Sequence, residues 1–413
     1  MSILWIDGFE LDRSSGSLSL NYDSPSGWSG AIASTNGRYG GKSLRSETSS
    51  ASTARTPALP WTQAFSNRRL FVGVALRAVS PGTSTIITGV GESGGLACWT
   101  VSTIESSSST FSLEFKDSDG TLLDTSLAIA YGDWIYLELD TAGVTSSNWE
   151  WRINNIVIGS GWGANFLPVP SSPHSTVELA WPSLSSGYLE FDDYYLSEDA
   201  YLTSSFVVEG FVPTGDGSSL DWSPKIAGPH YVQVYDSGDV DLDDTYIQTD
   251  VDADLDVFTF GMLNIIDGGV YAMRYQVDAR NTDATARTIT PSLIVEGVPS
   301  TSEPGFLVDA QTYQRFGRIL PTNPVDSSTW QIGDFAGISL GAVKGAAVNI
   351  YTLPLQDEDQ TAGYFLVEDI SAMIPLFDEA GVAGQLATHD TNTNLKILDE
   401  DQIEGDFPLT VTN

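Results

Sequence analysis

Apolar and polar residues alternate strictly along short segments of this chain, and this alternation most limits what the chain can fold into. Residues 111–115 (FSLEF) and 149–153 (WEWRI) alternate at every position, and residues 71–76, 134–139 and 188–191 repeat the pattern. Gly-, Ser- and Asp-rich breaks separate these segments. Because a two-residue period with frequent turns is that of a half-buried strand, we predict an antiparallel β-sandwich here rather than βαβ units.

Charge is spread unevenly and indicates where modules meet. Residues 1–200 carry 21 acidic and 10 basic side chains, whereas residues 201–413 carry 33 and 8. A polar, Gly-rich connector follows Pro213, and residues 357–413 hold 13 acidic side chains against the single Lys396. Such gradients accompany module boundaries, so we predict three parts: residues 1–203, 206–356 and 357–413.

The second and third parts differ in their patterns. Strands are predicted at 231–235, 257–260, 270–277, 292–295 and 346–355, which makes residues 206–356 a second β-sandwich. In the acidic extension, Leu366, Ile370, Met373, Ile374 and Phe377 follow helical spacing, and Pro375 would break or kink that short helix. The expected fold class is all-β, with two antiparallel β-sandwich (jelly-roll or lectin-like) domains and a small mixed C-terminal extension.

Composition argues against several kinds of site. The one cysteine, Cys98, removes a disulfide framework and any Cys-based zinc cluster, and its apolar neighbours predict a buried structural thiol. The three histidines, His174, His230 and His389, show no metal-ligand spacing. Neither a serine triad nor a phosphate-binding loop is predicted, and residues 159–163 (GSGWG) are expected to form a loop between strands. We therefore predict no catalytic, cofactor-binding or metal-binding residue, and no cofactor.

Charge and hydropathy also narrow the partners. The formal net charge of −36 disfavours binding to a nucleic-acid backbone or to an anionic membrane surface. No apolar run approaches the roughly 20 residues that span a bilayer, so membrane insertion is not expected. The first residues lack the basic and long apolar regions of a signal peptide, which disfavours a secreted lectin.

Aspartates recur between residues 239 and 256 and raise the question of calcium. Asp250, Asp252 and Asp254 mimic the start of an EF-hand loop, but the glycine position is Leu255 and the last ligand position is Gly261. The same alternation describes a strand with a solvated acidic edge, which discourages edge-to-edge pairing. We favour the strand, and calcium binding by this segment stays open.

Paired carboxylates could instead serve a glycan-degrading enzyme with a lectin-like fold. Glu190 and Asp192 fall on one face of a predicted strand, with Asp193 beside them, but no third carboxylate follows at the offset that such enzymes often use. With 54 acidic residues in the chain, a pair of this kind is expected by chance.

Aromatic residues are candidates for contact with sugars or with a partner protein. Trp134, Trp149 and Trp151 lie in alternating segments and are expected to be mostly core residues. Trp28, in a Gly-Trp-Ser-Gly string, and Trp162 are the better candidates for an exposed contact.

Four segments in the first part of the chain form a recognisable set: residues 6–10 (IDGFE), 37–45 (GRYGGKSLR), 132–136 (GDWIY) and 189–196 (LEFDDYYL). They resemble the concanavalin A/laminin-G-like modules of tailed-phage structural proteins. This resemblance covers about residues 1–200. It implies that the Asp-Gly-Phe start and the Asp-Asp-x-Tyr end form neighbouring strands that close the sandwich.

A second resemblance covers about residues 206–356. Its motifs occur in this order: residues 213–219 (PTGDGSS), Trp222, 228–234 (GPHYVQV), 243–247 (DDTYI), 254–258 (DLDVF), 321–324 (PTNP) and Trp330. They resemble a β module of phage tail-fibre-like and minor virion proteins. That module usually ends its chain or nearly so, whereas residues 357–413 follow it here. The resemblance offers no catalytic residue.

Together these observations predict a non-enzymatic structural protein of a tailed-phage virion, assembled in the host cytoplasm. We expect an exposed, tail-fibre-like or accessory component whose first module touches host-surface glycan. The alternatives are a capsid decoration (cement or head-fibre) protein and, more distantly, the glycan-degrading enzyme. Expected partners are other virion proteins of the tail or capsid and further copies of the chain, as a homo-oligomer for which the resemblance and particle symmetry suggest a trimer.

Overall fold

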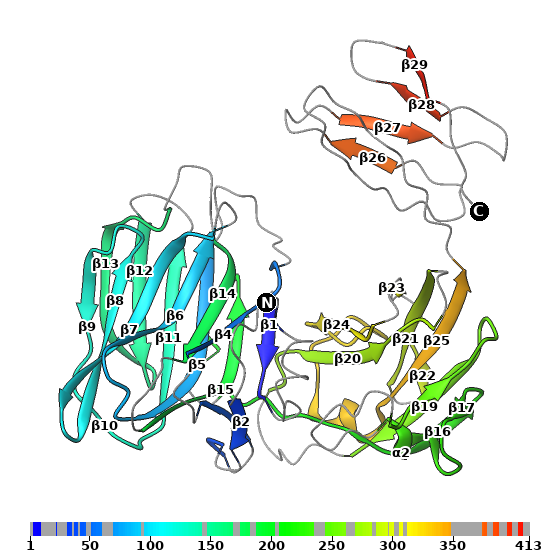
Figure 1. Cartoon of the computed structure of the whole chain (residues 1–413), viewed down its shortest axis with the longest axis horizontal. Helices are drawn as coiled ribbons and strands as arrows, with labels where there is room; N and C mark the ends of the chain where they lie inside the picture. The colour runs from blue at the N-terminus through cyan, green and yellow to red at the C-terminus, as the bar shows by residue number, and fades with distance from the viewer. Residues whose placement is uncertain are drawn as a thin grey trace.

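The structure is a computed structural model and is all-β, built from antiparallel sheets (Figure 1). The residues that it describes are 3–9, 22, 31–34, 37–39, 42–46, 51–59, 69–91, 95–142, 147–167, 174–181, 187–202, 206–234, 244–261, 269–282, 286–295, 297–300, 305–308, 312–347, 374–377, 383–387, 395–398 and 404–407.

Two sheets form a β-sandwich in the first part of the chain. In spatial order, the first sheet contains β13 (Ile156–Ala164), β12 (Ser147–Ile153), β11 (Ile135–Ala142), β5 (Arg69–Val79), β15 (Tyr188–Ser197), β3 (Ser43–Ser46) and β2 (Ala31–Ser34), with β1 (Ile3–Asp7) also on β15. The second contains β10 (Ile129–Ala130), β8 (Thr110–Asp117), β7 (Ala97–Ser107), β6 (Ser84–Gly91), β14 (His174–Trp181) and β4 (Ser52–Arg55), with β9 (Leu122–Thr125) also on β8.

The alternation along each strand produces the core between these sheets. Along β12, Trp149, Trp151 and Ile153 are buried, and the positions between them are more exposed. The ring of Phe115, on the opposite sheet, lies 5.8 Å from that of Trp149 and 6.0 Å from that of Trp151, between centroids. The prediction of core tryptophans is confirmed for these two, whereas Trp134 is only partly buried.

The strand pair that closes the sandwich is the one that the resemblance implies. β1 runs antiparallel to β15, with Asp7 opposite Tyr194. The Asp7 carboxylate accepts hydrogen bonds from the Phe9 backbone N–H (2.8 Å) and from the Tyr22 hydroxyl (2.9 Å). The Asp-Gly-Phe start is therefore held in place by its own aspartate.

The polar, Gly-rich stretch after Pro213 was predicted as a connector, but it forms the first strand of a second group of sheets. The segment that leads into this group is residues 206–212, which we call the connector. The larger sheet contains β16 (Pro213–Leu220), β19 (Leu255–Phe260), β25 (Ser339–Ala347), β21 (Arg287–Val295) and β22 (Val298–Pro299), with β23 (Phe306–Val308) also on β21. Two ribbons pair β17 (Ser223–Pro224) with β18 (Ile247–Gln248) and β20 (Met273–Ala279) with β24 (Gln314–Leu320), and the short helices are α2 (His230–Gln233) and the 3₁₀ helix η2 (Ile332–Gly337). Trp330 anchors a small core there: its indole N–H donates to the Leu320 carbonyl (2.8 Å), and its ring lies 5.3 Å from that of Phe335.

One predicted strand is a helix. Residues 230–233 form α2, although their sequence alternates like a strand. The Asp216 carboxylate accepts the backbone N–H groups of His230 (3.2 Å) and Tyr231 (2.7 Å). A side chain that satisfies the first amide groups of a helical turn competes with a strand ladder, and here it decides the local structure.

The predicted loop at residues 159–163 is also wrong, because these residues lie within β13. Gly159 and Gly161 face Trp151 and Trp149 across the strand pair. A Cβ atom on Gly161 would lie 2.8 Å from the Trp149 ring. These two glycines make room for the tryptophans instead of forming a turn.

The C-terminal extension contains a further antiparallel sheet of β26 (Ile374–Phe377), β27 (Ala383–Ala387), β28 (Leu395–Leu398) and β29 (Glu404–Phe407). Residues 374–377 are thus a strand where the helical spacing predicted the end of a helix. Residues 366–373 of that predicted helix, and residues 348–355 of the predicted strand 346–355, lie outside the described residues.

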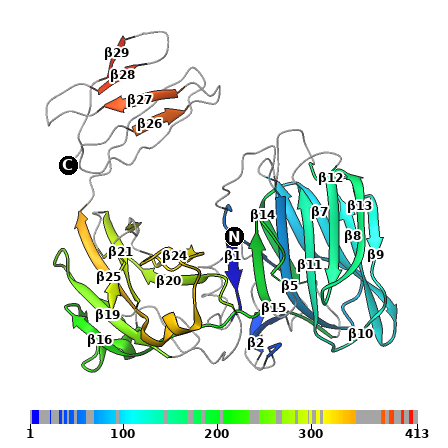
Figure 2. The same ribbon diagram turned by 180° about the vertical axis from the view of Figure 1, so that it is seen from behind.

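The connector side of the first sandwich contacts the second group of sheets. In both views β1 lies between the two groups, close to β20 and β24 (Figures 1 and 2). Arg274 of β20 donates to the Ile6 carbonyl (2.9 Å), lies 3.8 Å from the Asp7 carboxylate, and stacks its guanidinium 3.9 Å from the ring centroid of Trp5.

Candidate functional site

A cluster of polar side chains surrounds an exposed tryptophan at the edge of the first sheet. A shallow depression of about 430 Å³ is lined by Arg69, Asp140, Asn148, Trp149, Glu150, Ser160, Gly161 and Trp162, which we call the Trp162 site. Its side chains come from β5, β11, β12 and β13.

Strand register explains why these polar side chains lie together. Asp140 of β11 pairs with Glu150 of β12, and Glu150 pairs with Ser160 of β13, which gives one row across three strands. The alternate positions of β12, Trp149 and Trp151, point into the core. Because side chains alternate between faces, the row lies on the outer face of the sheet.

Trp162 is exposed because of where it lies in β13. Its side chain is 74% exposed, and β13 is the edge strand of the sheet. The pairing of β12 with β13 shifts between Ser147↔Ala164 and Trp149↔Gly161, so β13 carries an extra residue beside Trp162. Gly163 has a φ of +89°, a left-handed conformation that favours glycine. A bulge of this kind redirects a neighbouring side chain, and edge bulges are common beside functional sites.

One ion pair fixes the charge at the far side of the site. Arg69 donates from Nε to Asp140 Oδ1 (2.7 Å) and from Nη2 to Oδ2. Burial raises the pKa of the Asp140 carboxyl, and the hydrogen bond from Arg69 opposes that rise. The same hydrogen bond raises the pKa of Arg69. We take the pair as charged near neutral pH, since bidentate arginine–carboxylate contacts favour both ionised forms.

A second ion pair holds the neighbouring carboxylate. Arg152 donates from Nε to Glu150 Oε1 (2.7 Å), and its guanidinium lies 4.1 Å from the ring centroid of Tyr201. The Tyr201 hydroxyl donates to the Glu150 carbonyl (3.1 Å). Both carboxylates of the site are thus tied to an arginine, and they can accept further hydrogen bonds from a ligand's hydroxyl groups.

Glu190 and Asp192 occupy one face of β15, as predicted, but line neither this site nor a larger cavity of about 1200 Å³ that extends from β1 into the second group of sheets. Glu190 is 0% exposed; it accepts a hydrogen bond from Arg77 and lies 4.0 Å from Arg45. Asp192 accepts the backbone N–H groups of Arg38 and Asp193, both at 2.8 Å. Their contacts are those of structural carboxylates.

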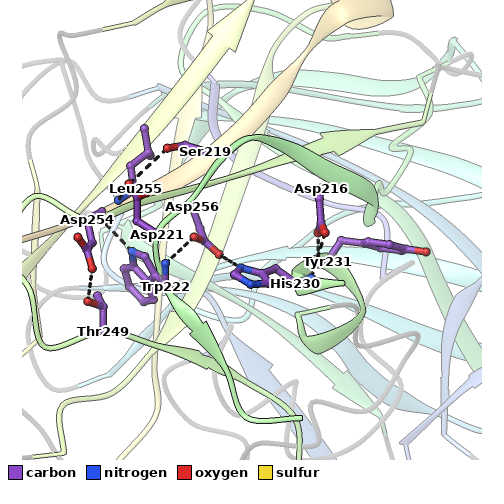
Figure 3. A network of polar contacts seen from close by, with 10 residues as sticks. All are labelled: Asp216, Ser219, Asp221, Trp222, His230, Tyr231, Thr249, Asp254, Leu255 and Asp256. Atoms are coloured by element: carbon purple, nitrogen blue, oxygen red, sulfur yellow. Dashed lines mark hydrogen bonds and ion pairs between the residues drawn. The ribbon is translucent and has the colours of Figure 1, made fainter. Parts of the chain in front are cut away.

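Two aspartates near residue 250, Asp252 and Asp254, have separate partners, and Figure 3 shows the contact of Asp254 with Thr249. The Thr249 hydroxyl donates to Asp254, and Asp252 forms ion pairs with Lys344 and, at 3.9 Å, with Arg287. Among the described residues, no three His, Cys, Asp or Glu side chains are grouped as a metal ion would require. Of residues 250–256, only 255 and 256 lie in a strand, so the predicted acidic strand edge is shorter than expected, and residues 239, 241 and 243 lie outside the described part.

Four residues from the second resemblance, Asp216, Trp222, His230 and Asp256, form one network of hydrogen bonds (Figure 3). Asp256 is 0% exposed and contacts His230 Nδ1 (2.6 Å) and the Trp222 backbone N–H (2.8 Å). Asp216 holds the backbone of His230, as described above. Within the described residues, no hydroxyl or thiol group hydrogen-bonds the His230 ring. We therefore interpret this Asp–His pair as structural.

The string Gly-Ile-Ser-Leu-Gly at residues 337–341 has the spacing of a nucleophile elbow, which the prediction of no serine triad did not take into account. Ser339 opens β25 directly after η2. An elbow needs a strand followed by a helix, and this order is the reverse.

The other candidates named from the sequence are Cys98, Trp28 and Trp162. Cys98 is buried, as predicted, and burial raises the pKa of its thiol to about 12. Trp162 is exposed, as predicted, whereas Trp28 lies outside the described residues. The sequence did not indicate Arg69, Asp140 or Glu150, because only the register of four strands brings them to Trp162. Among the described residues no helix is long and apolar enough to cross a membrane.

No protein family and no curated protein matches this sequence. Solved structures with a similar fold include alginate lyase Aly36B (14% identity, TM-score 0.33, 48% of this chain and 96% of that chain). They also include a carbohydrate esterase from Shiga toxin-encoding bacteriophage phi24B (12%, 0.33, 48% and 100%) and the binding domain of Paraclostridial Mosquitocidal Protein 1 (11%, 0.33, 63% and 75%). At such identities and TM-scores, these similarities say nothing of what this chain binds.

Proposed function

We propose that this chain is a non-enzymatic structural protein of a tailed-phage virion, exposed on the particle, whose first module contacts glycans of the host surface. The observation that carries the glycan contact is the Trp162 site: an exposed indole beside charged and polar side chains that are already held in place. Aromatic faces bind the apolar face of a sugar, and neighbouring polar groups fix its orientation.

The virion assignment rests on the two resemblances, which together span about residues 1–356. The strand pairing of β1 with β15 and the meeting of Asp216, Trp222, His230 and Asp256 give both sets of motif residues a structural role. Such structural roles fit a subunit of an assembly. A homo-oligomer, with trimeric symmetry, is part of this proposal.

Electron microscopy of gold-labelled particles tests the location. Antibodies against this chain should label the tails of particles released from bacteria that produce the phage. Label on the capsid shell would favour a capsid decoration protein over the tail component. Particles that carry no label, in preparations where the antibody detects the purified chain, would contradict the virion assignment.

The absence of catalysis needs its own test. The purified chain is incubated with host-envelope polysaccharide, and reducing ends and unsaturated products are measured over time. We expect no release, because the carboxylates of the Trp162 site are tied to Arg69 and Arg152 and those of β15 are buried. The non-enzymatic assignment would be overturned if the chain released such products and a folded variant did not. The variants to compare are Asp140→Asn, Glu150→Gln and Glu190→Gln.

A further inference from the structure

We infer that the Trp162 site binds a neutral pyranose, a hexose or N-acetylhexosamine unit, and discriminates against uronic and sialic acids. This inference rests on the proposed glycan contact and adds the ligand class. It follows from the access to the indole face, from the charges around it and from the spacing of the polar groups.

The indole of Trp162 is open to a flat ligand. Its chain neighbours are Gly161 and Gly163, so no adjacent side chain on β13 can cover it. Gly161 must stay small because the Trp149 ring lies against it on the core side, and apart from the two adjoining residues no atom lies within 4 Å of the position that a Cβ on Gly163 would take. Trp162 is 74% exposed, so its indole is free to meet a ligand.

The charges around the indole disfavour an anionic sugar. The site contains two carboxylates, Asp140 and Glu150, and one cation, Arg69. Arg69 already uses Nε and Nη2 on Asp140, and Arg152, just outside the site, is engaged by Glu150. A sugar carboxylate would meet two like charges and only cations that are already paired, whereas hydroxyl groups can donate to both carboxylates.

Spacing indicates where the ring and its hydroxyl groups lie. Asn148 is opposite the bulge of β13, next to Trp162, and the row Ser160–Glu150–Asp140 runs from the edge inward to Arg69. From β13 to β5 there are three strand spacings, or about 14 Å. A ring stacked on Trp162 therefore reaches Asn148 and Glu150, and a following sugar unit reaches Asp140 and Arg69.

The test uses the full chain labelled with 5-fluorotryptophan and observed by ¹⁹F NMR. The Trp162 resonance is identified as the one that is lost in Trp162→Phe. Methyl glucoside, methyl galactoside, N-acetylglucosamine, glucuronic acid and sialic acid are then titrated in turn. We expect at least one neutral sugar to shift the Trp162 resonance and the two acidic sugars to leave it unchanged.

Matched variants separate the indole from the strand. Trp162→Ala should weaken binding of the neutral sugar by about tenfold, since an aromatic stack contributes on the order of 1 kcal/mol or more beyond burial. Ile156→Ala, an exposed apolar residue on the same strand outside the site, should leave affinity unchanged. Thermal unfolding of each variant confirms that the sandwich is intact.

The possible failures are distinguishable. Tighter binding of an acidic sugar that depends on Trp162 overturns the ligand class and leaves the proposed glycan contact standing. No shift with any sugar, together with no retention of the chain on host-envelope polysaccharide, overturns both. A Trp162→Ala chain that changes its oligomeric state in light scattering but keeps its affinity for polysaccharide overturns the site, and identifies this edge as a contact between copies.

Discussion

At the scale of single residues, buried charges distinguish structural carboxylates from those that can meet a ligand. Glu190 and Asp140 are both almost fully buried and both paired with arginine, yet only Asp140 borders a depression. Arg77 donates a hydrogen bond to Glu190, and its guanidinium lies 4.8 Å from the ring centroid of Trp134. Removing Arg77 leaves the buried Glu190 carboxylate with only the more distant Arg45, at 4.0 Å, to balance its charge.

Arg77→Ala is therefore expected to destabilise the chain by about 3 kcal/mol, the usual cost of breaking a buried ion pair from one side. Urea unfolding at neutral pH measures the change. The matched control is Arg55→Ala, which removes the partly exposed pair with Glu178 (2.8 Å) and should cost under about 1 kcal/mol. Equal effects of the two substitutions would contradict the structural role assigned to Glu190.

Cys98 gives a prediction for pH. Burial raises the pKa of its thiol from 9.0 to about 12. Between these values the unfolded chain loses the thiol proton and the folded chain keeps it, so the free energy of unfolding falls as pH rises, by at most about 1.4 kcal/mol per pH unit. Denaturant unfolding from pH 8 to 11 should show a shallower fall in Cys98→Ala than in the original chain. Parallel slopes would mean that the thiol is not buried.

At the scale of secondary-structure elements, some of the fold follows from sequence periodicity alone. The strands β5, β8, β11, β12 and β15 were all predicted from alternation. Burial alternates along β12, whereas β5, β11 and β15 are buried along nearly their whole length, on both faces of the sheet. β13 was not predicted, because Gly159 and Gly161 resemble turn residues until Trp149 and Trp151 are known to lie against them. α2 was predicted as a strand because its alternation is real, and a distant carboxylate, Asp216, determines the outcome.

The Trp162 site could likewise be predicted from the sequence only in part. Trp162 was named from the sequence as a candidate for an exposed contact, whereas its polar companions depend on strand register, which one sequence does not reveal. Asp140 and Glu150 are two among 54 acidic residues until β11 and β12 are aligned.

Asp216→Ala tests what determines α2. Loss of the acceptor leaves two partly buried N–H groups without their partner. We therefore expect the free energy of unfolding to fall by about 1–3 kcal/mol and amide exchange at His230 and Tyr231 to increase. Hydrogen exchange measured by mass spectrometry reports on both residues. The control is Asp221→Ala, which removes an exposed carboxylate that accepts the Leu255 N–H (3.2 Å). Amide exchange across α2 should not change in this variant. Unchanged exchange in Asp216→Ala would show that α2 forms without this carboxylate.

At the scale of the whole molecule, the contacts of β1 with β20 determine how the two groups of sheets act on each other. Arg274 combines a hydrogen bond to β1, a nearby carboxylate and a stacked indole, and its side chain is 11% exposed. Cation–π contacts that are shielded from water contribute up to about 2 kcal/mol.

Arg274→Ala is expected to loosen that junction. Proteolysis within the connector, residues 206–212, should become faster, and calorimetry should show unfolding transitions that lie further apart than in the original chain. Arg315→Ala is the control, since it breaks the pair with Asp278 (2.7 Å) within the β20–β24 ribbon. That variant should lose stability without faster cleavage of the connector. Connector cleavage that is the same in Arg274→Ala and the original chain would argue against the junction.

The most direct test of the central claim is binding of the purified chain to cell envelopes of the host, before and after periodate oxidation of their glycans. Periodate cleaves sugar diols and leaves proteins on the envelope largely intact, so we predict strong binding to untreated envelopes and loss of binding after oxidation. Trp162→Ala should bind untreated envelopes as weakly as the original chain binds oxidised ones. Binding that survives both periodate and Trp162→Ala would show that the first module does not contact host glycan through this site.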